Sequence, residues 1–142
     1  MTSLARMLQG TPYVAYSYAY PHKTAYRPLA APIPLRRLWA DEHKDALFLY
    51  LHIPFCEMRC GFCNLFTSAN PQPAFASAYL DALERQARRV RAAIGPAAFA
   101  RLAIGGGTPT YLSPTNLERL FDLATKLFGV DLPAVPTSVE TS

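Results

Sequence analysis

Long hydrophobic runs, widely spaced cysteines and a secretory signal are all missing from this sequence of 142 residues. No run approaches the roughly 18 apolar residues that a membrane-spanning helix needs, so we expect no membrane span. The only cysteines are Cys56, Cys60 and Cys63, whereas a disulfide framework has an even number at wide spacing. Residues 1–10 lack the charged, apolar and small-residue pattern of a signal peptide. Together these absences favour a protein of the reducing cytoplasm.

Charged residues are also few, and the two signs are nearly balanced. The chain has 14 Lys and Arg against 10 Asp and Glu, a net charge of +4, and 51% apolar residues. This composition excludes a wholly disordered chain, which would have low hydrophobicity and high net charge. Nucleic-acid binding needs a basic stripe joined to a recognisable reader motif, and no such motif is present. We therefore expect no nucleic-acid partner.

Proline is the residue type in excess, with 13 in the chain. Five of the prolines fall within residues 11–34, interleaved with tyrosines. So many prolines exclude a long helix or a central strand there. We expect residues 1–45 to form an irregular N-terminal arm rich in Tyr and Pro, which ends in a short helix over Leu35–Lys44.

From residue 46 onward, the hydrophobic pattern alternates between strand and helix. The expected strands cover residues 46–53, 99–104 and 135–140, and the expected helices cover residues 73–94 and 114–128. The continuous apolar run of the first strand is typical of a strand buried on both faces. Ser113 is the expected N-cap of the second helix and Gly129 its C-cap. The order predicts an α/β fold with parallel strands joined by right-handed crossovers. Because the chain ends at a strand without a closing helix, we expect residues 46–142 to be the first part of a longer protein.

The three cysteines directly follow the first expected strand. In an α/β protein this loop lies at the carboxyl end of the strands, where barrel and open-sheet active sites lie. Three thiols at this spacing suit an iron–sulfur cluster or zinc. A cluster of four irons held by three thiolates would leave one iron open to a substrate or cofactor, whereas structural sites normally have four protein ligands. A structural zinc site completed by His52 or by another residue is the alternative.

Two motifs carry a resemblance to a known family. They are Tyr50-Leu-His-Ile-Pro-Phe-Cys56, continued by Cys60-Gly-Phe62-Cys63, and Gly105-Gly-Gly-Thr-Pro-Thr110. Together they resemble the radical S-adenosylmethionine (SAM) superfamily, within it the branch of oxygen-independent coproporphyrinogen III oxidase and HemW-like proteins. The resemblance covers residues 46–142 and implies that they form the first βαβαβ part of a partial (β/α) TIM barrel.

The resemblance also implies a set of ligand contacts. Cys56, Cys60 and Cys63 would hold a [4Fe-4S] cluster whose fourth iron is chelated by SAM. The residues that would contact SAM are Tyr50, Phe62, Gly106, Gly107, Thr108 and Glu140. Phe62 would flank the adenine, and the glycine loop would approach the methionyl end, since a backbone without Cβ comes close to a ligand.

The implied activity is reductive cleavage of SAM to a 5′-deoxyadenosyl radical that abstracts hydrogen from a substrate. This predicts a radical SAM oxidoreductase, similar to the coproporphyrinogen III oxidases of porphyrin biosynthesis, with a small, tetrapyrrole-related substrate. An electron donor such as flavodoxin or ferredoxin is implied as well. Leu65 stands where those oxidases have a further cysteine, which shifts weight toward the HemW-like alternative, a heme-binding chaperone without oxidase activity. A zinc-stapled interaction domain is the third hypothesis.

Three side chains near the cysteines have two interpretations each. Tyr50 alternates with apolar neighbours, so it either contacts SAM or fills the barrel interior. His52 either orders the cysteine loop by hydrogen bonding or is a satisfied core histidine. Arg59 lies between two cysteines and either lowers their pKa or lies in solvent.

Overall fold

The computed structural model describes residues 27–61, 63 and 65–141. The chain divides into two units, Met1–Ile33 and Pro34–Ser142, and the described helices and strands all belong to the second. Phe62 and the part of the predicted arm before residue 27 lie outside the described residues, and the division at residue 45 remains a prediction. Among the described helices, none has both the length and the apolar character needed to cross a membrane.

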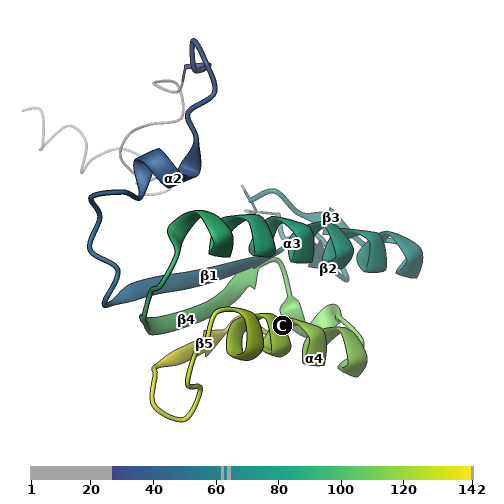
Figure 1. The fold of residues 1–142 in the computed structure, drawn as a ribbon. Helices are drawn as coiled ribbons and strands as arrows, with labels where there is room; N and C mark the ends of the chain where they lie inside the picture. Colours follow the sequence, from purple (N-terminus) through teal and green to yellow (C-terminus); the bar gives the residue numbers. More distant parts are fainter. Residues whose placement is uncertain (1–26, 62, 64, 142) are drawn as a thin grey trace, which may run out of the picture. The chain divides into compact units, whose positions relative to one another are not determined.

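A parallel three-stranded sheet lies at the centre of the second unit (Figure 1). Its strands, in spatial order, are β1 (Leu47–Ile53), β4 (Phe99–Gly106) and β5 (Thr137–Val139). The crossovers contain helix α3 (Pro73–Ile94) and helix α4 (Pro114–Asp122), which continues into a π-helical turn, η3 (Leu123–Leu127). The predicted α/β fold and its strand–helix alternation are therefore confirmed.

The two helices cover one face of this sheet (Figure 1), and the core lies between them and the strands. β1 contributes Leu49, Leu51 and Ile53 to the core, and β4 contributes Leu102 and Ile104. Side chains alternate between the two faces of a strand, so the neighbours of these residues lie on the other face.

The prediction that β1 is buried on both faces is wrong for the described residues. Phe48 is 61% exposed and Tyr50 48% exposed. The reason is that α3 and α4 lie on the same side of the sheet (Figure 1), so the alternate side chains of β1 meet no covering layer. The sequence pattern reports how apolar a strand is, but not how many layers pack on it.

Other differences concern short elements. Helix α2 covers only Leu35–Leu38, because the polar segment after Ala40 offers no apolar face to bury. The sequence also gave no sign of a second sheet, in which β2 (Phe55–Cys56) pairs in parallel with β3 (Ser68–Ala69). Strands of two residues have no periodicity to recognise. A 3₁₀ turn, η2 (Pro109–Tyr111), leads toward α4.

Helix α4 begins as predicted, and the predicted end near Gly129 is reached by η3, because the last turn is π-helical rather than α-helical. Its N-cap is Ser113, whose Oγ accepts a hydrogen bond from the Asn116 N–H at 3.4 Å. At the far end, Gly129 has a φ of 74° and its N–H donates to the Thr125 carbonyl at 3.0 Å. This left-handed conformation suits glycine after a helix.

Replacement of Ser113 by alanine should lower the free energy of unfolding by about 1 kcal/mol, because one N–H at the start of α4 loses its acceptor. Ser113→Asp should retain the stability, since aspartate is an equally good N-cap. Chemical denaturation of the full-length protein measures both variants. Equal stability of Ser113→Ala and wild type would show that the cap contributes nothing.

Candidate functional site

The ends of the three parallel strands meet at one edge of the sheet. Ile53 of β1 pairs with Gly106 of β4, and Val139 of β5 pairs with Ile104. The cysteine loop, the glycine loop and Glu140 therefore leave the sheet at the same edge. In a parallel α/β sheet this carboxyl edge is where ligands bind.

Two backbone hydrogen bonds fasten the glycine loop to the start of the cysteine loop. The Gly107 N–H donates to the Ile53 carbonyl at 2.7 Å, and the Thr108 N–H donates to the Phe55 carbonyl at 2.6 Å. A Cβ on Gly107 would lie 2.5 Å from the Phe55 oxygen and 2.9 Å from Cys56 Sγ. Only glycine permits this approach, so the backbone at Gly107 lies directly against the first predicted cluster ligand.

Glu140 reaches the same loop from β5. Its Oε2 accepts a hydrogen bond from the Gly106 N–H at 2.8 Å, and its own N–H donates to the Ile104 carbonyl at 3.0 Å. A Cβ on Gly105 would lie 2.6 Å from the carboxylate carbon. Gly105, which sequence reasoning left out of the site, thus makes the space for Glu140. In the described part of the chain no other donor reaches this carboxylate, so its second oxygen remains open to a ligand.

His52 connects three segments of the site. Its Nδ1 lies 3.1 Å from the Tyr50 hydroxyl, and its Nε2 lies 3.3 Å from the Phe66 carbonyl. The Tyr79 hydroxyl donates to the His52 carbonyl at 2.6 Å. Because a carbonyl oxygen can only accept a hydrogen bond, Nε2 must carry the proton that it donates to Phe66, and Nδ1 then accepts from the Tyr50 hydroxyl. These contacts favour the interpretation that His52 orders the cysteine loop.

Tyr50 lies on the uncovered face of the sheet, half-exposed, with its hydroxyl held by His52. Burial, and then the negative charge of Glu140, raise the pKa of the Tyr50 phenol above its usual value. The side chain is therefore neutral at physiological pH, and its ring is open to a ligand. Both interpretations of Tyr50 remain compatible with this position.

The three thiols differ in exposure. Cys56, in β2, and Cys63 are half-buried, whereas Cys60 is exposed. The Cys63 N–H donates to the Cys60 carbonyl at 3.0 Å, which makes a tight turn between them. As the described side chains stand, no three among His, Cys, Asp and Glu are close enough together to hold a metal ion. The donor set itself fits an iron–sulfur cluster, because it consists of three thiols in one loop beside a glycine backbone that leaves room for it.

Two polar contacts act on Cys63. Its Sγ lies 3.5 Å from Thr67 Oγ1, and Arg59 Nη2 donates to its carbonyl at 3.4 Å. The Thr67 hydroxyl, then the Leu65 backbone and Arg59, lower the pKa of the Cys63 thiol. Arg59 thus acts on a cysteine although its side chain is exposed. Thr67 escaped the sequence analysis because a threonine outside any motif carries no signal.

Replacement of Thr67 by valine, which has a similar size but no hydroxyl, should raise the pKa of the Cys63 thiol in iron-free protein. The thiolate then loses a hydrogen-bond donor that stabilises it. Thr67→Ser keeps the hydroxyl and should keep the lowered pKa. The measurement is the pH dependence of Cys63 alkylation, with the site located by tandem mass spectrometry. An unchanged profile in Thr67→Val would show that the hydroxyl does not act on this thiol.

Comparison with known proteins finds two named kinds of relative, coproporphyrinogen III oxidases and the heme chaperone HemW. A scan against protein-family models finds no match. The oxygen-independent coproporphyrinogen III oxidase of Salmonella typhimurium is 32% identical over 132 residues, which are 84% of this chain and 27% of that protein. The heme chaperone HemW of Bacillus subtilis is 38% identical over 78 residues, 55% of this chain and 20% of that protein. Among solved structures, the coproporphyrinogen III oxidase HemN of Escherichia coli, described as a radical SAM enzyme, matches with a TM-score of 0.76 and 28% identity. That match covers 91% of this chain and 30% of HemN.

The chain is a homologue of oxygen-independent coproporphyrinogen III oxidase and of HemW. The predicted fold, the first part of a radical SAM barrel, is confirmed by the similarity to HemN. This homologue spans between a fifth and a third of the length of the relatives described above.

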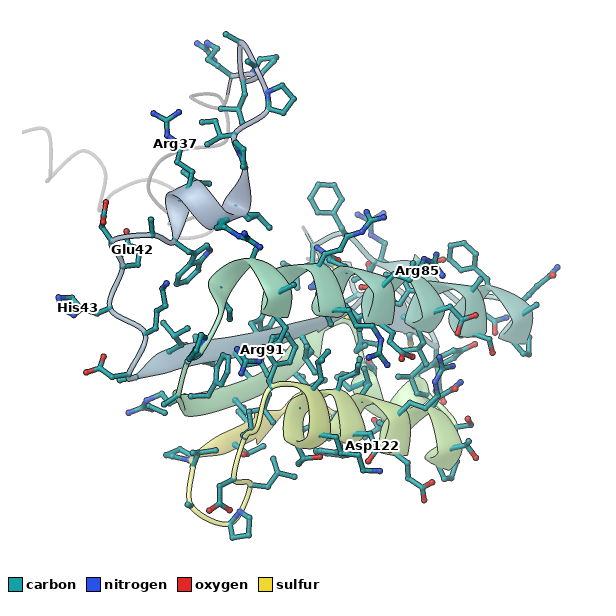
Figure 2. The ribbon with its side chains drawn as sticks, in the orientation of Figure 1. Arg37, Glu42, His43, Arg85, Arg91 and Asp122 are labelled. Carbon is teal, nitrogen blue, oxygen red and sulfur yellow. The ribbon has the colours of Figure 1, made fainter. Side chains whose placement is uncertain are left out.

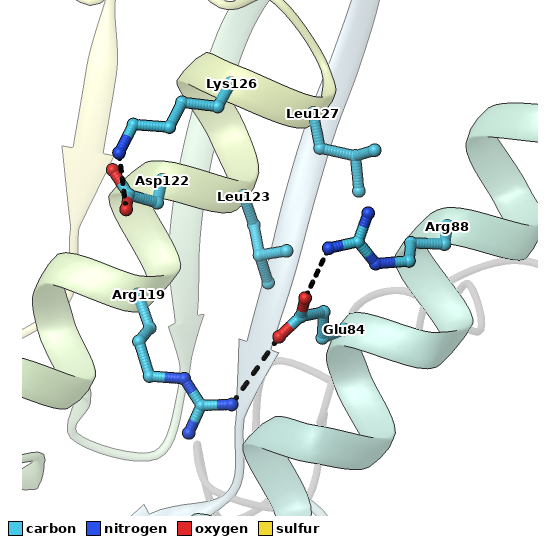
Figure 3. Close-up of a pocket in the computed structure, with 7 residues that line it drawn as sticks. All are labelled: Glu84, Arg88, Arg119, Asp122, Leu123, Lys126 and Leu127. Atoms are coloured by element: carbon cyan, nitrogen blue, oxygen red, sulfur yellow. Dashed lines mark hydrogen bonds and ion pairs between the residues drawn. The ribbon is translucent and has the colours of Figure 1, made fainter.

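A groove lies between α3 and the helical segment formed by α4 and η3 (Figure 3). Its volume is about 280 Å³. Its charged side chains are already paired: Arg88 with Glu84 at 2.6 Å, Arg119 with Glu84 at 3.5 Å, and Lys126 with Asp122 at 2.8 Å. Because every charge has a partner and the groove lies on the helical side of the sheet, it is not the candidate site.

Proposed function

We propose that the chain forms the part of a radical SAM protein that binds a [4Fe-4S] cluster and SAM. Cys56, Cys60 and Cys63 would hold the cluster. The observation that carries this proposal is the close approach of Gly107 to Cys56, where a Cβ would lie 2.9 Å from Sγ, at the sheet edge where Glu140 accepts from the Gly106 N–H. A thiol, a close backbone and an open carboxylate oxygen are there within one small region. The reduced thiols this requires fit the reducing cytoplasm.

The residues of the chain would bind and orient the ligands. The open oxygen of Glu140 would accept a hydrogen bond from the amino group of SAM, and the glycine loop would admit its methionyl end. Thr108, Tyr50 and Phe62 would complete the SAM contacts, with Phe62 beside the adenine. When bound, the cluster and SAM would supply one-electron cleavage of SAM to a 5′-deoxyadenosyl radical that abstracts hydrogen from a substrate.

The proposed substrate is a small, tetrapyrrole-related molecule, and the support for it is the coproporphyrinogen oxidation after which the relatives are named. We propose that an electron donor such as flavodoxin or ferredoxin reduces the cluster. The second candidate function is that of a HemW-like heme chaperone without oxidase activity. It is favoured by Leu65, which is 48% exposed and stands where the resemblance places a further cysteine in the oxidases.

The test is anaerobic reconstitution of the full-length protein with iron and sulfide, followed by metal and sulfide analysis and EPR. About four irons per chain and an EPR signal that changes on addition of SAM would support the proposal. Zinc without sulfide, or a cluster that does not respond to SAM, would overturn it. Retention of heme without turnover of coproporphyrinogen would favour the chaperone over the oxidase.

A further inference from the structure

The uncovered face of the sheet bears a row of side chains below the candidate site. Phe48 of β1 pairs with Arg101 of β4, and the next row outward contains Tyr50, Ala103 and Ser138. Arg101 and Gly105 are four positions apart on β4, which corresponds to roughly 13 Å along the strand at about 3.3 Å per residue. Arg101 therefore lies on the same face as the proposed SAM site, but deeper.

Arg101 lines a cavity of about 200 Å³ on this face. The other lining residues are Phe48, Leu102, Ala103, Pro136, Thr137 and Ser138. Thr137 uses its hydroxyl to donate to the Val135 carbonyl at 3.3 Å, whereas the Ser138 hydroxyl makes no hydrogen bond to the described residues. The cavity thus offers a cationic group, a hydroxyl and an exposed aromatic ring.

The charge of Arg101 is uncompensated in the described part of the chain. Arg88, Arg119 and Lys126 on the helices each pair with a carboxylate, but no carboxylate of residues 27–61, 63 or 65–141 pairs with Arg101. A guanidinium on a strand face presents a planar fork of N–H donors that matches a carboxylate in two parallel hydrogen bonds. An organic acid with an apolar body would satisfy Arg101 and cover Phe48 at the same time.

We propose that Arg101 binds a carboxylate of the substrate in this cavity, with the Ser138 hydroxyl as a second donor and Phe48 against the apolar body. The inference rests on the proposed function, which places the reacting end of the substrate at the carboxyl edge of the sheet. A molecule that reaches from that edge to Arg101 must be extended and acidic. A ring system with several carboxylates has both properties, whereas a single amino acid is too short.

The test compares binding of coproporphyrin III, which has four carboxylates, with binding of its tetramethyl ester. Fluorescence quenching gives the Kd in the full-length protein. Arg101→Gln should raise the Kd of the acid about tenfold, as expected for loss of a charge-assisted hydrogen bond, and Arg101→Lys should raise it less. The ester should bind the wild type as weakly as the acid binds Arg101→Gln. Arg85→Gln is the matched control, because Arg85 lies exposed on α3 (Figure 2) and its loss should leave the Kd unchanged.

Iron content and the EPR response to SAM are measured on the same samples, so that the two proposals can fail separately. Wild-type protein that binds cluster and SAM but not coproporphyrin, or binds it equally well in Arg101→Gln, would overturn the inference and leave the proposed function standing. A drop in Tm larger than that of Arg85→Gln, with no change in Kd, would assign Arg101 to a protein carboxylate and would also overturn it. Binding that depends on Arg101 in a protein without cluster would retain the carboxylate site and overturn the proposed function.

Discussion

Replacement of Cys60 by alanine should reduce the iron content of the reconstituted protein from about four atoms per chain to nearly none, because two thiolates do not hold a cluster of this type. Of the three cysteines, Cys60 is the one whose replacement disturbs the packing least. Its side chain is exposed, and its link to the rest of the loop is the backbone hydrogen bond from the Cys63 N–H. The substitution therefore removes a ligand without removing a packed side chain. Iron and sulfide analysis after anaerobic reconstitution gives the result.

The matched control for Cys60→Ala is Met58→Ala. Met58 lies in the same loop and is 73% exposed, so its loss changes neither a thiol nor the packing, and iron content should be unchanged. Cys56→Ala removes a half-buried side chain and tests folding as well as ligation. Full iron content in Cys60→Ala would contradict the three-cysteine ligand set. Loss of iron in Met58→Ala would show that the assay reports loop integrity and not ligation.

The elements that could be predicted from sequence are those whose signal is local and long. Helix α3 begins at Pro73 and ends at Ile94, the range that the apolar spacing of the sequence predicts. The pairing of β2 with β3 could not be predicted, since it depends on the course of the chain between Cys56 and Ser68 and not on a repeat. The exposure of Phe48 and Tyr50 could not be predicted either, because it depends on which faces of the sheet the helices cover.

The candidate site, too, could be predicted from the sequence only in part. The cysteine spacing and the glycine run can be recognised in the sequence, but the distance between Gly107 and Cys56 depends on two backbone hydrogen bonds across separate strands. The contact of Gly105 with Glu140 joins residues that are far apart in the chain and depends on the register of β4 and β5. A glycine run in a sequence indicates that another group of the protein or a ligand lies close to the glycine backbone. Only the three-dimensional arrangement identifies what approaches.

The glycine loop offers the second large effect, a loss of about 3 kcal/mol or more in the free energy of unfolding for Gly106→Ala. Two costs combine there. The φ of Gly106 is 111°, a conformation that strains any residue with a Cβ. A Cβ at this position would also overlap the His52 ring, and that ring is held at both nitrogens by Tyr50 and the Phe66 carbonyl. Overpacking against a fixed group adds to the strain.

Three further glycines separate these two costs by denaturant unfolding of the full-length protein. Gly61 has open space and an ordinary φ, so Gly61→Ala should change stability by less than about 0.5 kcal/mol. Gly129 has a φ of 74° and open space, so Gly129→Ala should cost about 1 kcal/mol from backbone strain alone. Gly107 has an ordinary φ but meets the Phe55 carbonyl, so Gly107→Ala should cost about 2 kcal/mol from the clash alone.

A double-mutant cycle then tests whether the His52 ring is the group that Gly106 must avoid. Removal of the ring in His52→Ala relieves the clash but not the strain at φ, so the double variant should be more stable than the sum of the two single losses predicts. The difference between them is the energy of the clash. Strict additivity would show that the ring moves aside in Gly106→Ala and that backbone strain accounts for the whole loss. In that case His52 would not fix the position of the glycine loop, and its hydrogen bonds would serve the cysteine loop alone.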